Sequence, residues 1–205
     1  MIDTVLFDYG GVIAEEGFRG GLLVIARNNG LHPEAFYEGV CRLIADSGYL
    51  TGDSDEASFW ALLRREYGLA QTGGELRSEI LNRFILRPGV IDAAQRLRRG
   101  GMQVGIISDQ TNWLDELNRR DGFFACFDPV FNSFHLRASK YRGDLFDAVA
   151  AQLGSSPESI LLVDDSAANI DKARQRGFTA ILYENEQRLM QEMQKIFPDV
   201  FQGAQ

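Results

Sequence analysis

The sequence of 205 residues is poor in the residue types that build disulfide scaffolds and imidazole metal sites. Its two cysteines, Cys41 and Cys126, lie far apart in apolar contexts. This arrangement favours two reduced core thiols over a disulfide. Its two histidines, His32 and His135, are expected at the surface or within a helical insertion.

An excess of positive charge and long apolar runs are also missing. The net charge is -8, the pI is about 4.8, and no block of lysine or arginine stands out, so we expect neither nucleic acid nor an anionic membrane as a partner. No stretch approaches the ~20 apolar residues of a membrane span. Asp3 and Asp8 interrupt the N-terminal region where a signal peptide would be apolar. We therefore expect a cytoplasmic protein; the oligomeric state does not follow from the sequence.

Asp8 ends an apolar run close to the N-terminus. Residues 4–7 are apolar or β-branched, and two glycines follow the acid, which predicts a buried parallel strand running into a tight turn. A second apolar run, residues 160–163, ends in Asp164 and Asp165. Open α/β sheets bind ligands at the carboxyl ends of their strands. If these strands are neighbours, three carboxylates converge, and a hard divalent cation is their ordinary counter-charge.

Residues 18 to 85 show helical periodicity and no convincing strand. Four helices are predicted here: residues 18–29, residues 33–45, a helix that Ser54 caps, and residues 75–84. Because this block follows the first strand, it predicts an insertion into the fold that the rest of the chain forms.

From residue 87 onward, strand and helix patterns alternate. Strands are predicted at residues 104–107, 130–131, 160–163 and 180–182, and helices at residues 91–99, 113–119, 145–153 and 167–176. Such alternation is typical of a parallel sheet with helices on both faces. We predict an α/β, doubly wound, Rossmann-like core (residues 1–14 and 86–205) with a small helical cap (residues 15–85). A chain that is 45% hydrophobic can bury one core and such an appendage.

Four segments, each at the end of a predicted strand, contain the polar side chains of interest: Asp8–Ile13, Gly105–Asp109, Asn132–Lys140 and Leu162–Asn169. In these segments the chain resembles the haloacid dehalogenase (HAD) superfamily, whose four motifs they match in order. Residues 52–60 are similar to the helix start of members with helical caps. The resemblance covers nearly the whole chain, implies a hydrolase with a HAD-like core, and is nearest to α-glucose-1-phosphate phosphatase-like members.

The resemblance implies a nucleophile and a metal site. Asp8 would attack phosphorus and become an aspartyl phosphate. Mg²⁺ would be bound by Asp8, by the carbonyl of Gly10 and by Asp165. Asp164 would either support the metal ligands without contacting Mg²⁺ or bind Mg²⁺ through a water molecule. Asn169 would orient the acidic pair.

Two further segments would bind the phosphate. Ser108 would donate its hydroxyl to a phosphate oxygen, assisted by Asp109 and the backbone amides that follow at the start of a helix. Lys140 would place a positive charge near Asp8 and the phosphoryl group. Tyr141 and Arg137 depart from the pattern here, because relatives often have proline and glycine at these positions.

Each residue also has a structural interpretation. Asp8 would cap a turn, Asp164 and Asp165 would cap the next helix, Ser108 would be a turn residue, and Lys140 would be a solvated loop lysine. Each of these interpretations explains a single residue, whereas the HAD pattern explains all of them together.

Gly10 is the main departure from the family pattern. Phosphatases of the superfamily usually carry there a second aspartate, which protonates the leaving group and later activates water. Its loss typically costs ~10²- to 10⁴-fold in rate. Glu15 and Glu16 are the nearest replacements in the sequence, and solvated surface glutamates are the competing interpretation.

Three functions follow from this sequence. The first is a Mg²⁺-dependent phosphatase acting on a small phosphorylated metabolite, a sugar phosphate among the candidates. The second is a 2-haloacid dehalogenase, which uses the same nucleophile without metal but usually lacks the acidic pair at Asp164 and Asp165. The third is a non-catalytic protein that binds a phosphorylated metabolite.

Overall fold

Five parallel strands form a single sheet in the order β3-β2-β1-β4-β5. The computed structural model describes residues 1–201. The strands are β1 (Thr4–Phe7), β2 (Gln103–Ser108), β3 (Val130–Asn132), β4 (Ile160–Asp164) and β5 (Thr179–Leu182). The predicted α/β, doubly wound fold is confirmed.

Register brings the carboxyl ends of the central strands together. The last residue of β1, Phe7, pairs with Ile106 of β2 and with Val163 of β4. The amide of Asp8 continues the ladder by donating to the Val163 carbonyl at 2.9 Å. After β1 the chain builds β2 and β3 on one side and then returns to build β4 and β5 on the other. β1 therefore borders the point where the strand order reverses, which is where such sheets bind ligands.

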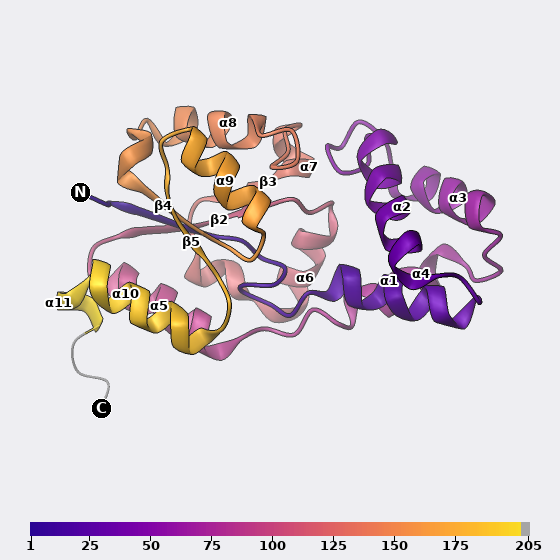
Figure 1. The fold of residues 1–205 in the computed structure, drawn as a ribbon, viewed down its shortest axis with the longest axis horizontal. Helices are drawn as coiled ribbons and strands as arrows, with labels where there is room; N and C mark the ends of the chain where they lie inside the picture. The colour runs from indigo at the N-terminus through magenta and orange to yellow at the C-terminus, as the bar shows by residue number, and fades with distance from the viewer. Residues whose placement is uncertain (202–205) are drawn as a thin grey trace.

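Both faces of the sheet are covered by helices (Figure 1). One layer contains α5 (Pro88–Arg99), α6 (Trp113–Asp121), α10 (Glu186–Ile196) and α11 (Pro198–Phe201), and the other contains α7 (Ser133–Leu136), α8 (Asp144–Leu153) and α9 (Ala167–Gln175). Two short 3₁₀ helices, Phe123–Cys126 and Pro157–Ser159, lie in the connections.

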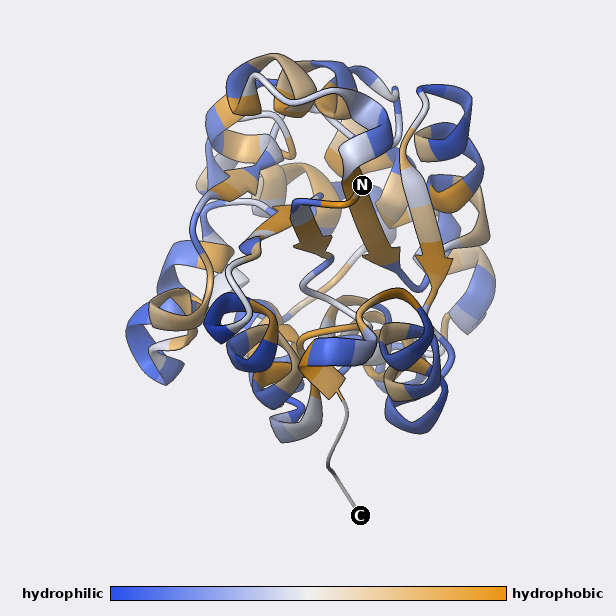
Figure 2. Cartoon of the chain, turned by 90° about the vertical axis from the view of Figure 1, so that its left-hand side faces the viewer, coloured by the Kyte–Doolittle hydropathy of each residue, from blue (hydrophilic) through white to orange (hydrophobic). Residues whose placement is uncertain are grey.

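The alternation of side chains along β1 separates two cores. Val5 and Phe7 belong to the larger core, whereas Leu6 between them belongs to the smaller core on the opposite face. Because both faces are buried, the strands are apolar without a polar alternation. Figure 2 shows these orange strands between helices that turn blue faces outward.

The insertion after β1 is a four-helix unit. It contains α1 (Gly17–Asn28), α2 (Pro33–Asp46), α3 (Glu56–Tyr67) and α4 (Gly73–Leu81). In Figure 1 the unit lies at the right, next to the sheet. α1 packs closely on α4 because Gly21 has no side chain: a Cβ there would lie 2.7 Å from the Cα of Ile80.

The two chain segments that join the helical unit to the core run side by side. The amide of Glu15 donates to the Ile85 carbonyl at 2.9 Å, and the amide of Arg87 donates to the Ile13 carbonyl at 2.9 Å. The helical unit thus leaves the core and returns to it at adjacent points.

The ends of the predicted helices agree with the structure to within about three residues, but α7, α10 and α11 have no counterpart in the prediction, and one cap is wrong. Asp55, and not Ser54, caps α3, because its carboxylate accepts the amide of Ser58 at 2.7 Å. Thr72 and Glu75 form a complete capping box at the start of α4. Cys41 and Cys126 are free and half-buried. Within residues 1–201, no helix has both the length and the apolarity needed to cross a membrane.

Candidate functional site

Three carboxylates meet at the carboxyl edge of the sheet. Asp8 follows β1, Asp164 ends β4, and Asp165 comes next in the chain. One oxygen from each lies within 4.8 Å of the other two. The expected convergence results from the direct pairing of β1 with β4. Three acids this close require positive charge among them.

Lys140 supplies one such charge. Its Nζ lies 2.8 Å from Oδ2 of Asp8 and 2.7 Å from Oδ2 of Asp164, and only 1% of its side chain is exposed. Burial alone would lower the lysine pKa, but the charges of Asp164 and Asp8 outweigh it, so that the pKa is raised. Burial also raises the pKa of Asp8, an effect that Lys140 opposes. Lys140 is therefore a buried, charged member of the cluster.

Asp164 has a full set of partners. Its Oδ1 accepts the Ser166 amide at 2.9 Å, and Nδ2 of Asn169 donates to Oδ1 at 3.0 Å and to Oδ2 at 3.2 Å. Together with Lys140, these donors fix the buried carboxylate. Asn169 thus contacts Asp164 of the acidic pair, and Asp164 contributes fixed negative charge behind the site.

Asp165 is free by comparison. No ion pair within residues 1–201 involves its carboxylate. Although the residue is exposed at the cleft, desolvation by neighbouring protein atoms, followed by the charge of Asp164, raises its pKa. Gly11 makes room for it, with φ at 82° and a position where a Cβ would lie 2.0 Å from Oδ2 of Asp165. A carboxylate held beside Asp8 without a protein counter-charge is a suitable cation ligand.

Asp109 holds the loop that carries Lys140. It accepts the Ser133 hydroxyl at 2.5 Å, the amide of Lys140 at 2.7 Å and the amide of Tyr141 at 3.1 Å. Asp109 lines the cleft, but its carboxylate oxygens are occupied by these donors. Arg137, which precedes this loop, has φ at 55°, a conformation that explains why glycine suits the position.

Ser108 lies at the end of β2, buried and facing the same cleft. Its carbonyl accepts the Ser133 hydroxyl at 3.2 Å. The next helix, α6, begins only at Trp113. The sequence analysis expected the amides after Ser108 at the start of a helix. They belong instead to a loop.

A cleft of about 430 Å³ opens between this edge of the sheet and the helical unit. The core contributes the polar side chains described above. The helical unit and α6 contribute mainly apolar side chains, namely Phe18, Tyr37, Ile44, Ala45, Leu50 and Trp113. Sequence analysis missed this set, because side chains at helical spacing are usually core residues.

Glu16 occupies the space beside Gly10. A Cβ on Gly10 would lie 2.8 Å from Oε2 of Glu16, and both residues line the cleft. The other oxygen, Oε1, accepts the amide of Arg19 at 2.9 Å and caps α1. Surrounding protein atoms raise the pKa of Glu16 by desolvation, although the carboxylate is reached by solvent through the cleft. Glu15 instead pairs with Arg87 at 3.0 Å.

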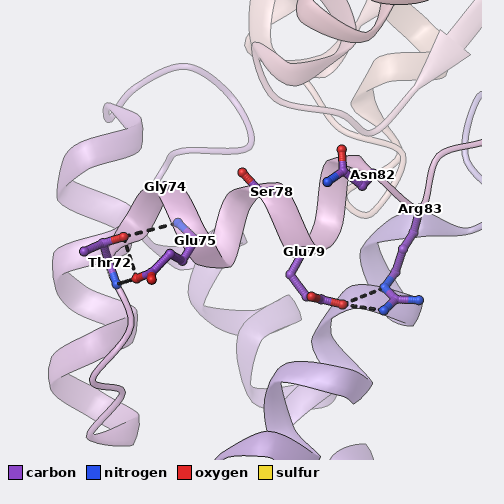
Figure 3. A pocket seen from close by; sticks show the side chains of 7 residues that line it. All are labelled: Thr72, Gly74, Glu75, Ser78, Glu79, Asn82 and Arg83. Carbon is purple, nitrogen blue, oxygen red and sulfur yellow. Dashed lines mark hydrogen bonds and ion pairs between the residues drawn. The ribbon is translucent and has the colours of Figure 1, made fainter.

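A larger hollow, of about 800 Å³, lies along α4 (Figure 3). Thr72 and Glu75 satisfy each other in the capping box, and Glu79 pairs with Arg83 one turn later. Its charged groups are thus paired within this segment, and it holds none of the acidic cluster. The acidic cluster borders the smaller cleft.

Residues 2–177 match the family model of the haloacid dehalogenase-like hydrolases. The chain belongs to this family. It is therefore a hydrolase of the superfamily that its motifs resemble, while the likeness to α-glucose-1-phosphate phosphatases stays a prediction.

Individual relatives are distant. Bifunctional epoxide hydrolase 2 of Mus musculus is 27% identical over 129 residues, which are 60% of this chain and 23% of that protein. The chain thus spans about a quarter of the length of this curated relative.

Solved structures share the fold. A HAD-family enzyme from Bacteroides thetaiotaomicron, in complex with magnesium and inorganic phosphate, has a TM-score of 0.69 at 17% identity and covers 90% of this chain and 95% of its own. L-2-haloacid dehalogenase from Xanthobacter autotrophicus, with chloropropionic acid covalently bound, has a TM-score of 0.63 at 19% identity, with coverages of 95% and 83%.

Proposed function

We propose that this hydrolase is a Mg²⁺-dependent phosphatase that cleaves small phosphate monoesters through an aspartyl phosphate on Asp8. The observation that carries the proposal is the composition of the site. Oxygens of three carboxylates lie within 4.8 Å of one another, and Lys140 forms ion pairs with two of them, Asp8 and Asp164. Their excess negative charge fits a divalent cation with oxygen ligands.

The residues that would hold Mg²⁺ are Asp8, Asp165 and the carbonyl of Gly10, with Asp164 behind them. Within residues 1–201 no hydrogen bond is accepted by the Gly10 carbonyl, so this oxygen is free to bind a cation. Bound Mg²⁺ would offset the repulsion between the phosphate and the attacking carboxylate. The Bacteroides thetaiotaomicron enzyme, which binds magnesium and inorganic phosphate on the same fold, supports this assignment.

The chain's own residues supply the two chemical steps. A carboxylate oxygen of Asp8 bonds to phosphorus while the bond from phosphorus to the ester oxygen breaks. Lys140 and the Ser108 hydroxyl offset charge on the phosphoryl oxygens. Water then attacks the phosphorus, its proton is removed, and inorganic phosphate leaves as the Asp8 carboxylate is restored.

Proton transfer in both steps needs an acid and base near Asp8, and we assign this role to Glu16. Its carboxylate lies next to the position that a residue-10 side chain would take. Desolvation by surrounding protein atoms raises its pKa, which favours the protonated form that a general acid needs. Of the two glutamates that the sequence offered, Glu15 is engaged with Arg87.

The dehalogenase alternative has one supporting observation, the covalent adduct in the Xanthobacter autotrophicus enzyme of the same fold. Asp165 argues against it here, because a carboxylate without a protein counter-charge beside the nucleophile would repel an anionic haloacid. A non-catalytic binding protein is disfavoured by the placement of Glu16.

The test is release of inorganic phosphate from 4-nitrophenyl phosphate with Mg²⁺, with EDTA, and with the Asp8→Asn variant. We expect activity only in the wild type with Mg²⁺. Mass spectrometry of the protein quenched in acid should show the mass of one phosphoryl group on the wild type and none on Asp8→Asn. Chloride release from 2-chloropropionate that EDTA leaves unaffected would replace the proposal with the dehalogenase.

A further inference from the structure

The two sides of the cleft differ in chemistry. The side chains that would bind the phosphate and its cation lie on the core side, around Asp8, Ser108 and Lys140, and Glu16 borders them from the N-cap of α1. Gln110 and Thr111 add neutral polar groups there, next to Ser108. A phosphate group bound at the core side therefore directs its ester substituent toward the opposite side.

The opposite side is an apolar wall, made of Phe18, Tyr37, Ile44, Ala45, Leu50 and Trp113. Aromatic rings dominate it. Phe18 stands between the other two rings, with its centroid 6.5 Å from that of Tyr37 and 6.3 Å from that of Trp113. Phe18 and Tyr37 are only half-buried, so a ligand in the cleft can cover the part of each ring that faces it.

Next to this wall, Arg19 is paired with a carboxylate, and the ionisable groups of Tyr37 and Cys41 are neutral. Arg19 lines the cleft, but its guanidinium donates to both carboxylate oxygens of Glu34, at 3.0 and 2.8 Å, and lies 5.5 Å from the ring centre of Tyr37. Burial raises the pKa of the Tyr37 hydroxyl and of the Cys41 thiol, so both stay neutral near pH 7. The wall therefore offers a substrate few hydrogen-bond partners.

Because the wall offers few hydrogen-bond partners, it discriminates between sugars and apolar rings. A sugar that enters the cleft must give up water from several hydroxyl groups, and each hydroxyl left without a partner costs binding free energy. An apolar ring loses nothing on leaving water and gains contact with Phe18, Tyr37 and Trp113. Shape and chemistry of the wall thus favour a ring over a polyol.

The volume of the cleft limits the size of the substrate. The cleft has about 430 Å³, whereas an apolar cavity of about 150 Å³ is enough for benzene. After the phosphate and its cation are placed, space for one compact ring system remains. A long acyl chain would extend out of the cleft.

We infer that the substrate is a phosphate monoester of a compact apolar alcohol carrying an aromatic ring, and not a sugar phosphate. This inference rests on the proposed phosphatase function and specifies its substrate class.

The experiment compares kcat/KM for benzyl phosphate and glucose 6-phosphate with Mg²⁺ at saturation. Both esters release a primary alcohol, so they differ little in the protonation that the leaving oxygen needs, and the comparison isolates the contacts of the ester substituent. We expect at least a tenfold preference for benzyl phosphate, the discrimination typical of one apolar group in a pocket. Acetyl phosphate, which has no ring, serves as a reference for the phosphate site.

Variants assign the preference to the wall. Phe18→Ala should raise KM for benzyl phosphate about tenfold more than it raises KM for acetyl phosphate. Ala45→Phe should give the same imbalance by filling the cleft. Phe124→Ala is the matched control, because Phe124 is also half-buried but lies outside the cleft; it should leave both KM values unchanged.

Each result has a definite meaning. Equal or faster hydrolysis of glucose 6-phosphate overturns the substrate class and leaves the phosphatase function standing. The same conclusion follows if Phe18→Ala and Ala45→Phe, both folded by circular dichroism, affect the benzyl and acetyl esters equally. Failure to hydrolyse benzyl, acetyl and 4-nitrophenyl phosphate with Mg²⁺ overturns the phosphatase function together with the inference built on it.

Discussion

Moving the acid from position 16 to position 10 tests whether Glu16 replaces the missing aspartate. Gly10 does not have the positive φ of Gly11, so its backbone can accept an aspartate. Space is the obstacle, because a Cβ there would lie 2.8 Å from Oε2 of Glu16. The perturbation therefore needs three proteins: Glu16→Ser, Gly10→Asp and the double variant. Serine is chosen because it also caps helices well, so α1 keeps its cap.

The expected magnitudes follow from the chemistry and from the geometry. Loss of a placed general acid costs ~10²- to 10⁴-fold, and we expect Glu16→Ser to slow benzyl phosphate by the lower of these values. Aryl phosphates should lose less than tenfold, because a phenolate leaves with little protonation. In Gly10→Asp two carboxylates would face each other at about 4 Å, where repulsion at an effective dielectric constant of ~20 is about 4 kcal/mol. This single variant should therefore be slow, and the double variant should be faster than either single one.

The assay is kcat/KM for a series of phosphate esters whose alcohols differ in pKa. Glu16→Ser should make the rate fall more steeply as the leaving-group pKa rises, and the double variant should return the slope toward that of the wild type. Glu16→Gln is a second control, since it keeps the cap acceptor at position 16 without an acidic proton. If Glu16→Ser and Glu16→Gln keep the wild-type slope, Glu16 is not the acid. If the double variant is slower than Glu16→Ser, residue 10 and residue 16 do not serve the same oxygen.

Four further predictions concern Asp8, Asp165, Lys140 and the stability effect of Glu16. Asp8→Asn should abolish turnover without lowering Tm, because it removes a carboxylate whose pKa burial raises; retained turnover would refute the covalent mechanism. Asp165→Ala should abolish the rise in Tm that Mg²⁺ gives the wild type without substrate, and an unchanged rise would place the cation elsewhere. Lys140→Met should lower stability by about 3 to 5 kcal/mol, since it leaves two buried carboxylates unpaired; equal urea midpoints would contradict this. Glu16→Gln should raise Tm at pH 8 but not at pH 4, with EDTA present. Desolvation by neighbouring protein atoms raises the Glu16 pKa. Below the ordinary pKa, Glu16 is protonated in the folded and in the unfolded protein, whereas above the folded-state pKa only the glutamate protein carries a partly desolvated charge. A gain at both pH values would contradict this reasoning.

The sequence predicted the strands well because parallel strands buried on both faces are continuous apolar runs. It could not by itself establish that β1 and β4 are neighbours, since that pairing joins residues more than 150 positions apart. The family resemblance was what supplied this step. The wrong cap of α3 has a local reason: Ser54 and Asp55 are both good capping residues, and only the observed hydrogen bond to Ser58 distinguishes them.

The buried position of Lys140 could not be predicted from the motif pattern alone. Its flanking residues depart from the family pattern, and that made a solvated lysine a real alternative. In the structure Asp109 binds the amides of Lys140 and Tyr141, so the loop is held by a side chain 31 positions away. Arg137 adopts the left-handed conformation in which glycine is usual. Tertiary hydrogen bonds of this kind replace local sequence preferences and leave no pattern in the sequence.

A general acid at Glu16 would also give the helical unit a part in the chemistry of this enzyme. An aspartate at position 10 would place the acid on the loop after β1, rigidly tied to Asp8. Glu16, the proposed acid, lies at the N-cap of α1, two residues before Phe18 of the apolar wall. The first turn of one helix would thus both contact the ester substituent and protonate its oxygen. Because these two groups cannot move independently, a substrate that packs poorly on Phe18 should also displace the acid, and a loss of apolar contact should lower kcat as well as raise KM.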